Sequence, residues 1–214
     1  MMALNRIYRL YLELCGKHGD PKSLWPQWCA DKKGSRLREI IAIGAILAQR
    51  TSWHNADLAL KNLKKARLLS LEKIASLKDL DVLKELIRPA GFYQTKPKRL
   101  FGLARFIAKE CGSLKNFIRE DLKAAREKLL NLYGIGPETA DTILLYAMDK
   151  PSFVIDEYTK RLAGELKLSK TLTYDYLKEL FEKSLPKSTD IYQDFHALII
   201  IDQRGRKASA MRAV

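Results

Sequence analysis

Residues Leu132-Tyr133-Gly134-Ile135-Gly136-Pro137-Glu138-Thr139-Ala140 form a glycine-containing turn between two apolar segments. Because glycine has no side chain, the backbone of such a turn can approach a phosphate closely. Pro137 suits the first position of a helix, and the N–H groups at that helix start would face the same anion. The stretch therefore predicts a junction of two helices that can hold a nucleic-acid backbone.

A single carboxylate follows this turn at a short distance. The segment Val154-Ile155-Asp156-Glu157-Tyr158 places Asp156 where it can cap a helix that runs through Leu162. A helix start is a rigid place for a carboxylate, so we expect Asp156 to cap the helix and also to act on the sugar that the turn brings to it.

The composition fits either a polyanionic partner or positive charge spread evenly for solubility, and the glycine turn favours nucleic acid. The 214 residues contain 39 Lys and Arg against 25 Asp and Glu, which gives a net charge of +14, and 47% of the residues are hydrophobic. Such an excess of positive charge is typical of proteins that bind nucleic acid or an acidic membrane surface. No apolar stretch is long enough to span a membrane, and Met1–Arg6 lacks the apolar core of a secretion signal. We expect a cytoplasmic, nucleoid-associated protein without a membrane partner.

Helical periodicity runs through nearly the whole chain and predicts an all-α fold of about ten helices. The stretches 40–47 and 142–147 are apolar on almost every face, which is typical of helices buried at the centre of a core. The run 197–201 could be a strand, but we expect a buried helix that continues from Tyr192.

These motifs together resemble the helix–hairpin–helix DNA glycosylase superfamily that includes endonuclease III. The resemblance covers about Ser23 to Ile201 and is closest to the small 3-methyladenine DNA glycosylases that lack an iron–sulfur cluster. Besides the hairpin, it rests on the segments Leu47–Thr51, Arg88–Lys96, Ala140–Ala147 and Phe195-His196.

The resemblance implies a fold of two helical lobes. A helical barrel, residues 36–150, would carry the hairpin, and a second lobe would combine residues 1–35 with 151–214. Asp156 would be the catalytic residue, facing an aromatic slot across the cleft between the lobes. Its carboxylate would stabilise the positive charge that develops on the sugar and would orient the attacking water.

Relatives sandwich the extruded base between side chains at positions that match Trp25, Pro26 and Trp53. Aromatic faces attract cations by about 0.5–2 kcal/mol, which suits a positively charged base such as 3-methyladenine. Gln49 and Phe92 match positions whose side chains enter the DNA stack to fill the gap. Phe92 could instead anchor its loop in the core.

The glycine turn and the basic cluster that follows Phe92 predict contacts of a further group of residues with the DNA backbone. Their side chains or backbone amides would meet phosphates, with Lys96 as the cation. These residues are Gly134, Ile135, Gly136, Thr139 and Lys96.

Two departures from the family pattern limit the chemistry. Glu138 stands where the bifunctional relatives carry a lysine, and a carboxylate cannot form a Schiff base. We therefore expect a monofunctional enzyme without AP-lyase activity. The three cysteines are far apart, and Ser209 and Ala210 stand where relatives begin their cysteine segment. We expect no iron–sulfur cluster and no catalytic metal, although hairpin carbonyls of relatives often hold a structural monovalent cation.

The predicted function is hydrolysis of the N-glycosidic bond of alkylated purines, 3-methyladenine first, in duplex DNA, by a monomer in base excision repair. His196 matches a family position, but we interpret it as structural. Arg204, Arg206 and Lys207 in the basic tail could touch DNA. One alternative is the same fold acting on a mismatched adenine or thymine or an oxidised pyrimidine. Another is a non-catalytic DNA-binding module, and a third is a basic helical scaffold with no DNA role.

Overall fold

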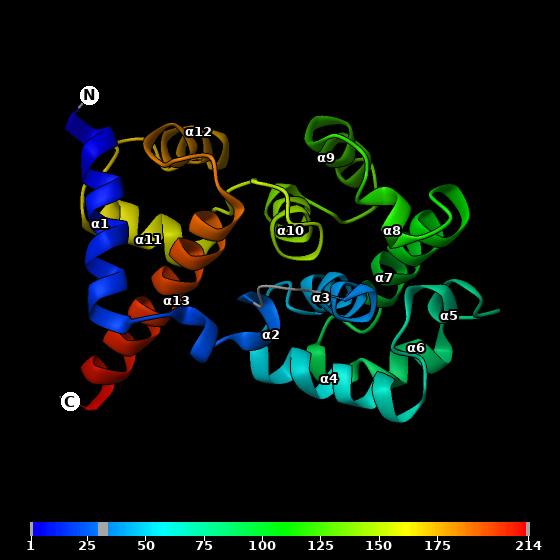
Figure 1. The fold of residues 1–214 in the computed structure, drawn as a ribbon. Coiled ribbons are helices and arrows are strands. Elements are labelled where there is room, and N and C mark those ends of the chain that lie inside the picture. Colours follow the sequence, from blue (N-terminus) through cyan, green and yellow to red (C-terminus); the bar gives the residue numbers. More distant parts are fainter. Residues whose placement is uncertain (1, 30–33, 213–214) are drawn as a thin grey trace. The chain divides into compact units, whose positions relative to one another are not determined.

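The computed structural model describes residues 2–29 and 34–212, and for residues 2–5, 26–27 and 206–212 it describes the backbone alone. Throughout these ranges the secondary structure is helical and contains no strand, which confirms the all-α prediction (Figure 1). Residue contacts divide the chain into two compact units. The first combines Met1–Asp31 with Asp149–Val214, and the second is Lys32–Met148.

The first unit is built from both ends of the chain. It contains α1 (Met2–His18), the short 3-10 helix η1 (Pro21–Ser23), α2 (Pro26–Cys29), α11 (Glu157–Glu165), α12 (Tyr174–Ser184) and α13 (Thr189–Arg212). The long helix α13 packs against α1 and α11. It includes residues 197–201, so the expected buried helix is confirmed and the strand is excluded.

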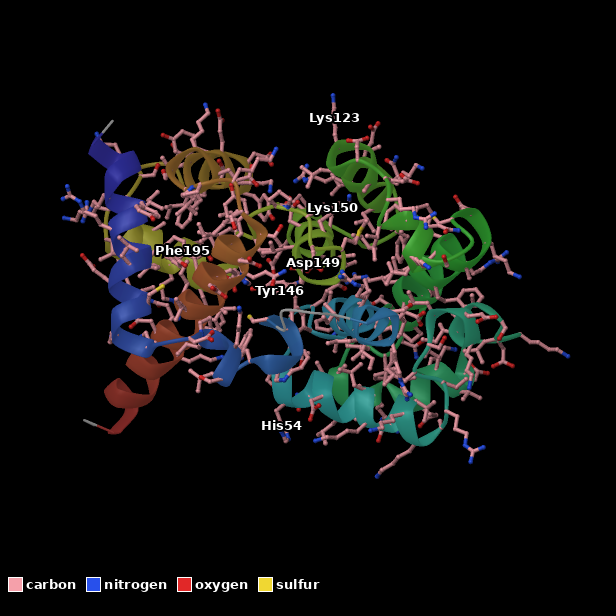
Figure 2. The ribbon with its side chains drawn as sticks, in the orientation of Figure 1. His54, Lys123, Tyr146, Asp149, Lys150 and Phe195 are labelled. Atoms are coloured by element: carbon pink, nitrogen blue, oxygen red, sulfur yellow. The ribbon has the colours of Figure 1, made fainter. Side chains whose placement is uncertain are left out.

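An aromatic cluster forms the core of this unit. Phe195 projects from α13 beside α1 (Figure 2), where its ring centroid lies 5.5 Å from that of Tyr11. The ring of Phe153 lies 4.9 Å from Phe181 and 5.5 Å from Tyr192. Aromatic rings at these separations pack favourably and exclude water. The cluster therefore fixes the segment around residue 153, which leads directly into α11.

The second unit carries the predicted hairpin. Its first half contains α3 (Ser35–Leu47), α4 (Trp53–Lys65), α5 (Leu71–Ala75), α6 (Asp81–Leu86), η2 (Arg88–Ala90) and α7 (Lys96–Arg105). Its second half contains the π-helical turn η3 (Phe106–Glu110), α8 (Leu114–Phe117), α9 (Leu122–Leu130), α10 (Pro137–Thr142) and the π-helical turn η4 (Ile143–Ala147).

Helix α3 and the turn η4 form the centre of this unit. Residues 41–47 and 143–147 are all buried, as their apolar composition predicts. The two elements pack against each other, and the Arg38 Nη1 donates a hydrogen bond of 2.8 Å to the carbonyl of Ala147. A bidentate ion pair, Arg126 with the fully buried Asp141 at 2.9 and 3.1 Å, ties α9 to α10. The two helices on either side of the hairpin are thereby held together.

Across the described ranges, no helix is both long enough and apolar enough to span a membrane.

Candidate functional site

Asp156 caps helix α11, as its position in the sequence predicts. Its Oδ1 accepts hydrogen bonds from the backbone N–H of Thr159 at 2.8 Å and from the Thr159 hydroxyl at 2.9 Å. These bonds satisfy one of the N–H groups that every helix start leaves unpaired. The side chain is 14% exposed, so the carboxylate is largely buried but still reaches the surface.

The chain that leads to Asp156 is held on both sides. Phe153, Val154 and Ile155 are buried. The backbone N–H of Phe153 donates to Glu182 Oε1 at 2.9 Å, and Lys178 Nζ donates to the Ser152 hydroxyl at 2.7 Å. Buried backbone polar groups need hydrogen-bond partners, and two side chains of α12 supply partners to this non-helical segment. The result is a non-helical segment with a fixed end at residue 156.

The electrostatic environment of Asp156 keeps it ionised. Burial on its own raises the pKa of this carboxyl, but the imidazole of His196 and the two hydrogen bonds from Thr159 outweigh burial. The net effect is a pKa below the ordinary value. Asp156 is therefore an anion at neutral pH, as required of a group that stabilises developing positive charge.

His196 is a site residue that the sequence analysis interpreted as merely structural. It is buried on α13, and its Nε2 lies 3.5 Å from Asp156 Oδ2. That separation is long for a hydrogen bond but short enough for a protonated imidazole to stabilise the anion. The match of Phe195-His196 to a family position was the signal that could have identified it.

Trp25 belongs to the same unit as Asp156 and is connected to its helix through one side chain. The guanidinium of Arg204 lies 5.7 Å from the ring centroid of Trp25 and 5.8 Å from that of Tyr158. Tyr158 is in the first turn of α11, two residues after Asp156. The structure thus brings a predicted pocket residue near the start of the helix that the predicted catalytic residue caps. The Pro26 side chain lies outside the described part of the chain.

The two hairpin glycines have different structural roles. Gly134 has a φ of +74°, and an added Cβ would lie 2.6 Å from Cδ and 2.7 Å from Cγ of Arg99. Gly136 has a φ of −89°, and no atom of the described residues lies within 4 Å of an added Cβ. The fold therefore requires glycine at 134 only, whereas glycine at 136 leaves open surface before the first turn of α10.

Gln49 is half-buried and holds the hairpin through its side-chain amide. Its Nε2 donates to the carbonyl of Gly134 at 3.0 Å and to Thr139 Oγ1 at 2.9 Å, while its Oε1 accepts from Arg99 Nη1 at 2.8 Å. In this conformation the amide does not project outward, so its predicted insertion into the DNA stack would require these three bonds to break.

Lys96 is not placed as predicted. It is fully buried, and its Nζ donates to the carbonyls of Leu47 and Ala90, both at 2.7 Å. The amine therefore cannot reach a phosphate, and the predicted contact is corrected to an internal one. Burial and the neighbouring Arg99 lower the pKa of Lys96 to about 8. The lysine links the end of α3 to the end of η2.

Phe92 is exposed at the tip of that loop. Gly91 and Phe92 have φ values of 72° and 49°, and residue Phe92 is 53% exposed. A non-glycine residue with positive φ is uncommon and is held by its surroundings. Here the Phe92 carbonyl accepts hydrogen bonds from the N–H groups of Thr95 and Lys96, both at 2.9 Å. The reading of Phe92 as a core anchor is excluded, which leaves the DNA wedge as its prediction.

Of the remaining predicted site residues, some are buried and others reach the surface. Ile135 is buried and its N–H bonds the carbonyl of Leu132, so the structure does not support its predicted phosphate contact. The Thr139 side chain is also buried, which leaves its backbone for such a role. Glu138 is exposed in the first turn of α10, and Trp53 is half-buried in the first turn of α4.

Tyr133 is an exposed residue that the sequence analysis did not single out. Its side chain is 65% exposed at the hairpin itself. A tyrosine at such a position is available for stacking or for a phosphate contact through its hydroxyl. Its place between Leu132 and Gly134 in the decisive stretch was the available signal.

Comparisons with known proteins identify the family of this chain. The model of the HhH-GPD superfamily of base excision DNA repair proteins matches residues 43–187. The chain belongs to this superfamily. It is a base excision DNA repair glycosylase by this membership, and the recognition of the family from its motifs is confirmed.

Two sequence relatives show how far the similarity extends. The glycosylase is 44% identical over 197 residues to a candidate DNA repair glycosylase of Methanocaldococcus jannaschii, covering 91% of this chain and 85% of the relative. It is 29% identical over 147 residues to endonuclease III of Thermotoga maritima, covering 69% of this chain and 65% of that protein.

Solved structures share the fold. The 3-methyladenine DNA glycosylase of H. pylori, in a crystal structure with 1,N6-ethenoadenine, has a TM-score of 0.77 and 29% identity, covering 95% of this chain and 98% of that one. An endonuclease III–DNA complex has a TM-score of 0.67 at 17% identity, covering 94% and 86%, and shows the same fold.

The cysteines do not fit the iron–sulfur cluster that some relatives carry. Such a cluster is ordinarily held by four thiolates close together, and this chain has three cysteines. Cys15 and Cys29 belong to the first unit and Cys111 to the second. We derive no chemistry through a cluster.

Proposed function

We propose that this glycosylase removes alkylated purines, 3-methyladenine first, from duplex DNA by hydrolysis of the N-glycosidic bond. The observation that carries the proposal is the ionised, largely buried Asp156 at the start of α11, in the same unit as Trp25. As the base leaves, the sugar carbon becomes positive, and a fixed carboxylate stabilises that charge. A base such as 3-methyladenine already carries positive charge, so this leaving group needs little acid assistance.

Binding and extrusion are assigned to the second unit. The open backbone at Gly136 and the N–H groups of the first turn of α10 would hold a phosphate. The exposed ring of Phe92 would fill the space that the extruded base leaves. The monomeric state is also part of this proposal.

The reaction should leave the DNA strand intact. Glu138 is exposed in the first turn of α10, where a carboxylate is favoured by the helix dipole and cannot attack the sugar as an amine would. Borohydride should therefore trap no enzyme–DNA adduct, and a trapped adduct would contradict the monofunctional assignment.

A cofactor is not part of the proposed reaction. A monovalent cation, if present, would be held by hairpin carbonyls. Those of Leu132 and Gly134 already accept hydrogen bonds from Ile135 and Gln49, so a cation would share their remaining lone pairs.

The decisive experiment measures bases released from methylated duplex DNA by chromatography, with wild type and Asp156→Asn. Asparagine caps helices about as well as aspartate, so the variant should fold while losing the negative charge. Asp121→Asn is a matched control, because Asp121 caps α9 with hydrogen bonds from Lys123 and Ala124. We expect at least about a 100-fold lower rate for Asp156→Asn, in the range seen when such electrostatic groups are removed, and an unchanged rate for the control.

Three outcomes would change the proposal. Near-wild-type release by a folded Asp156→Asn variant would refute the catalytic role. Release of an oxidised or mismatched base in preference to 3-methyladenine would move the enzyme to another substrate class on the same fold. Salt-sensitive DNA binding without any base release would identify a binding module instead.

A further inference from the structure

Arg204 occupies a defined position between two aromatic rings of the first unit. Its guanidinium lies 5.7 Å from the Trp25 centroid and 5.8 Å from the Tyr158 centroid, and its Nε donates to the Tyr158 hydroxyl at 3.4 Å. Both distances are within the range of cation–π attraction. Although Arg204 is exposed, its head group is therefore held over the aromatic faces rather than directed into solvent.

This position conflicts with the simplest account of the aromatic slot. A cationic base that stacks on Trp25 would be attracted by the ring, but it would meet a guanidinium that already makes the same interaction. The two positive charges would then lie a few ångströms apart and repel each other. A neutral base meets no such repulsion.

Arginine can also favour a neutral base directly. The guanidinium has five N–H donors in a planar arrangement, and it accepts nothing. A neutral modified purine offers unprotonated ring nitrogens or carbonyl oxygens at its edge as acceptors. Alkylation of a ring nitrogen removes one acceptor and adds the charge, so the two effects act in the same direction.

We propose that Arg204 sets the selectivity of the base slot, disfavouring bases that carry a fixed positive charge relative to neutral modified bases. The inference rests on the proposed function in one respect, because Trp25 must be a stacking partner of the extruded base. It concerns the ratio of the release rates of cationic and neutral modified bases, and not whether 3-methyladenine is released.

Three variants separate charge from shape. Arg204→Met removes the charge and keeps an unbranched side chain, while Arg204→Lys keeps the charge without the planar donors. Arg161→Met is the matched control, since Arg161 is exposed on α11, the helix that also carries Tyr158. Its guanidinium lies over the Tyr158 ring at 5.7 Å from the centroid. Each variant is first checked for wild-type thermal unfolding.

The assay compares single-turnover release of 7-methylguanine, which is cationic in DNA, with release of ethenoadenine, which is neutral. For Arg204→Met we expect the ratio of the cationic to the neutral rate to rise by about 5-fold or more, in keeping with the loss of one cation–π competitor. Arg204→Lys keeps the charge but loses the planar donors, so its ratio should lie between those of wild type and Arg204→Met, whereas Arg161→Met should stay near the wild-type ratio. An unchanged ratio in Arg204→Met, or an equal rise in Arg161→Met, would overturn the inference.

A binding measurement keeps this test apart from the proposed function. In the Asp156→Asn background, the dissociation constants for duplexes containing 7-methylguanine or ethenoadenine report the slot without catalysis. If the wild-type enzyme releases neither base, the ratio of dissociation constants decides the inference alone, while the proposed function is decided separately by release of 3-methyladenine. A shift on Arg204→Met toward the cationic duplex supports the inference, and no shift refutes it.

Discussion

The two hairpin glycines should respond in different ways to the same substitution. Gly134→Ala places a methyl group at a φ of +74° and within 2.7 Å of the Arg99 side chain. The backbone conformation costs about 1–2 kcal/mol for a residue with a Cβ. Displacing Arg99 adds a packing cost of about 1–3 kcal/mol. We therefore expect the free energy of unfolding to fall by about 2–5 kcal/mol, taking these two contributions together.

Gly136→Ala should leave stability almost unchanged. Its φ of −89° suits alanine, and an added methyl group would meet open space. The loss of chain entropy in the unfolded state favours alanine by about 0.4–1 kcal/mol, and the preference of helix starts for glycine over alanine opposes it by a similar amount. The methyl group would nevertheless cover the backbone that is proposed to meet a phosphate. Loss of one charged hydrogen bond corresponds to about 10-fold or more in DNA affinity.

Urea unfolding followed by circular dichroism and DNA binding followed by fluorescence anisotropy test the pair. A duplex with a stable abasic-site analogue serves as the ligand for both variants and for wild type. The reasoning is refuted if Gly136→Ala destabilises the protein as much as Gly134→Ala does. It is also refuted if Gly136→Ala binds DNA as tightly as wild type.

Three further predictions concern buried charges. His196→Ala should raise the pKa of Asp156, because burial then acts with less opposition, and the acidic limb of the base-release pH profile should move to higher pH; an unmoved limb would contradict the coupling. The pKa of Lys96 is about 8 in the folded protein against 10.5 in the unfolded chain, so the unfolded chain binds more protons between these values and stability should rise with pH there. Urea unfolding across that interval should show the rise in wild type and lose it in Lys96→Met, and a slope shared by both would exclude Lys96 as its source. Arg126→Met leaves the buried Asp141 without its ion pair and should cost about 3–5 kcal/mol in thermal or urea unfolding, part of which Asp141→Asn should restore in the double variant.

The features that follow from local sequence were predictable. Pro137 begins α10 because the fixed φ of proline suits the first helical position, and Asp156 caps α11 because its carboxylate accepts a hydrogen bond from an N–H three residues later. The apolar stretches at 41–47 and 143–147 are buried because no face of them is polar. The class of fold depended on such local patterns and was recoverable without the structure.

The features that depend on partners distant in the sequence could not be predicted from the sequence. Lys96 follows an exposed aromatic loop and is next to charged residues, which in sequence indicates a solvated side chain. Its burial depends on the carbonyls of Leu47 and Ala90, which only the folded unit brings together. The contact of His196 with Asp156 likewise joins residues 40 positions apart. Sequence patterns identify chemical types, whereas such pairings depend on tertiary packing.

The anchoring of residues 153–155 has a mechanical consequence for the reaction. Three consecutive buried side chains and the bonds from α12 leave the main chain before Asp156 little freedom to move. In the proposed reaction the carboxylate would therefore keep its place within its own unit. The deformation that brings the sugar to it would come from the nucleic acid. Damage that weakens base pairing lowers the work of that deformation, so a stationary anion would discriminate between intact and damaged DNA before any base is contacted.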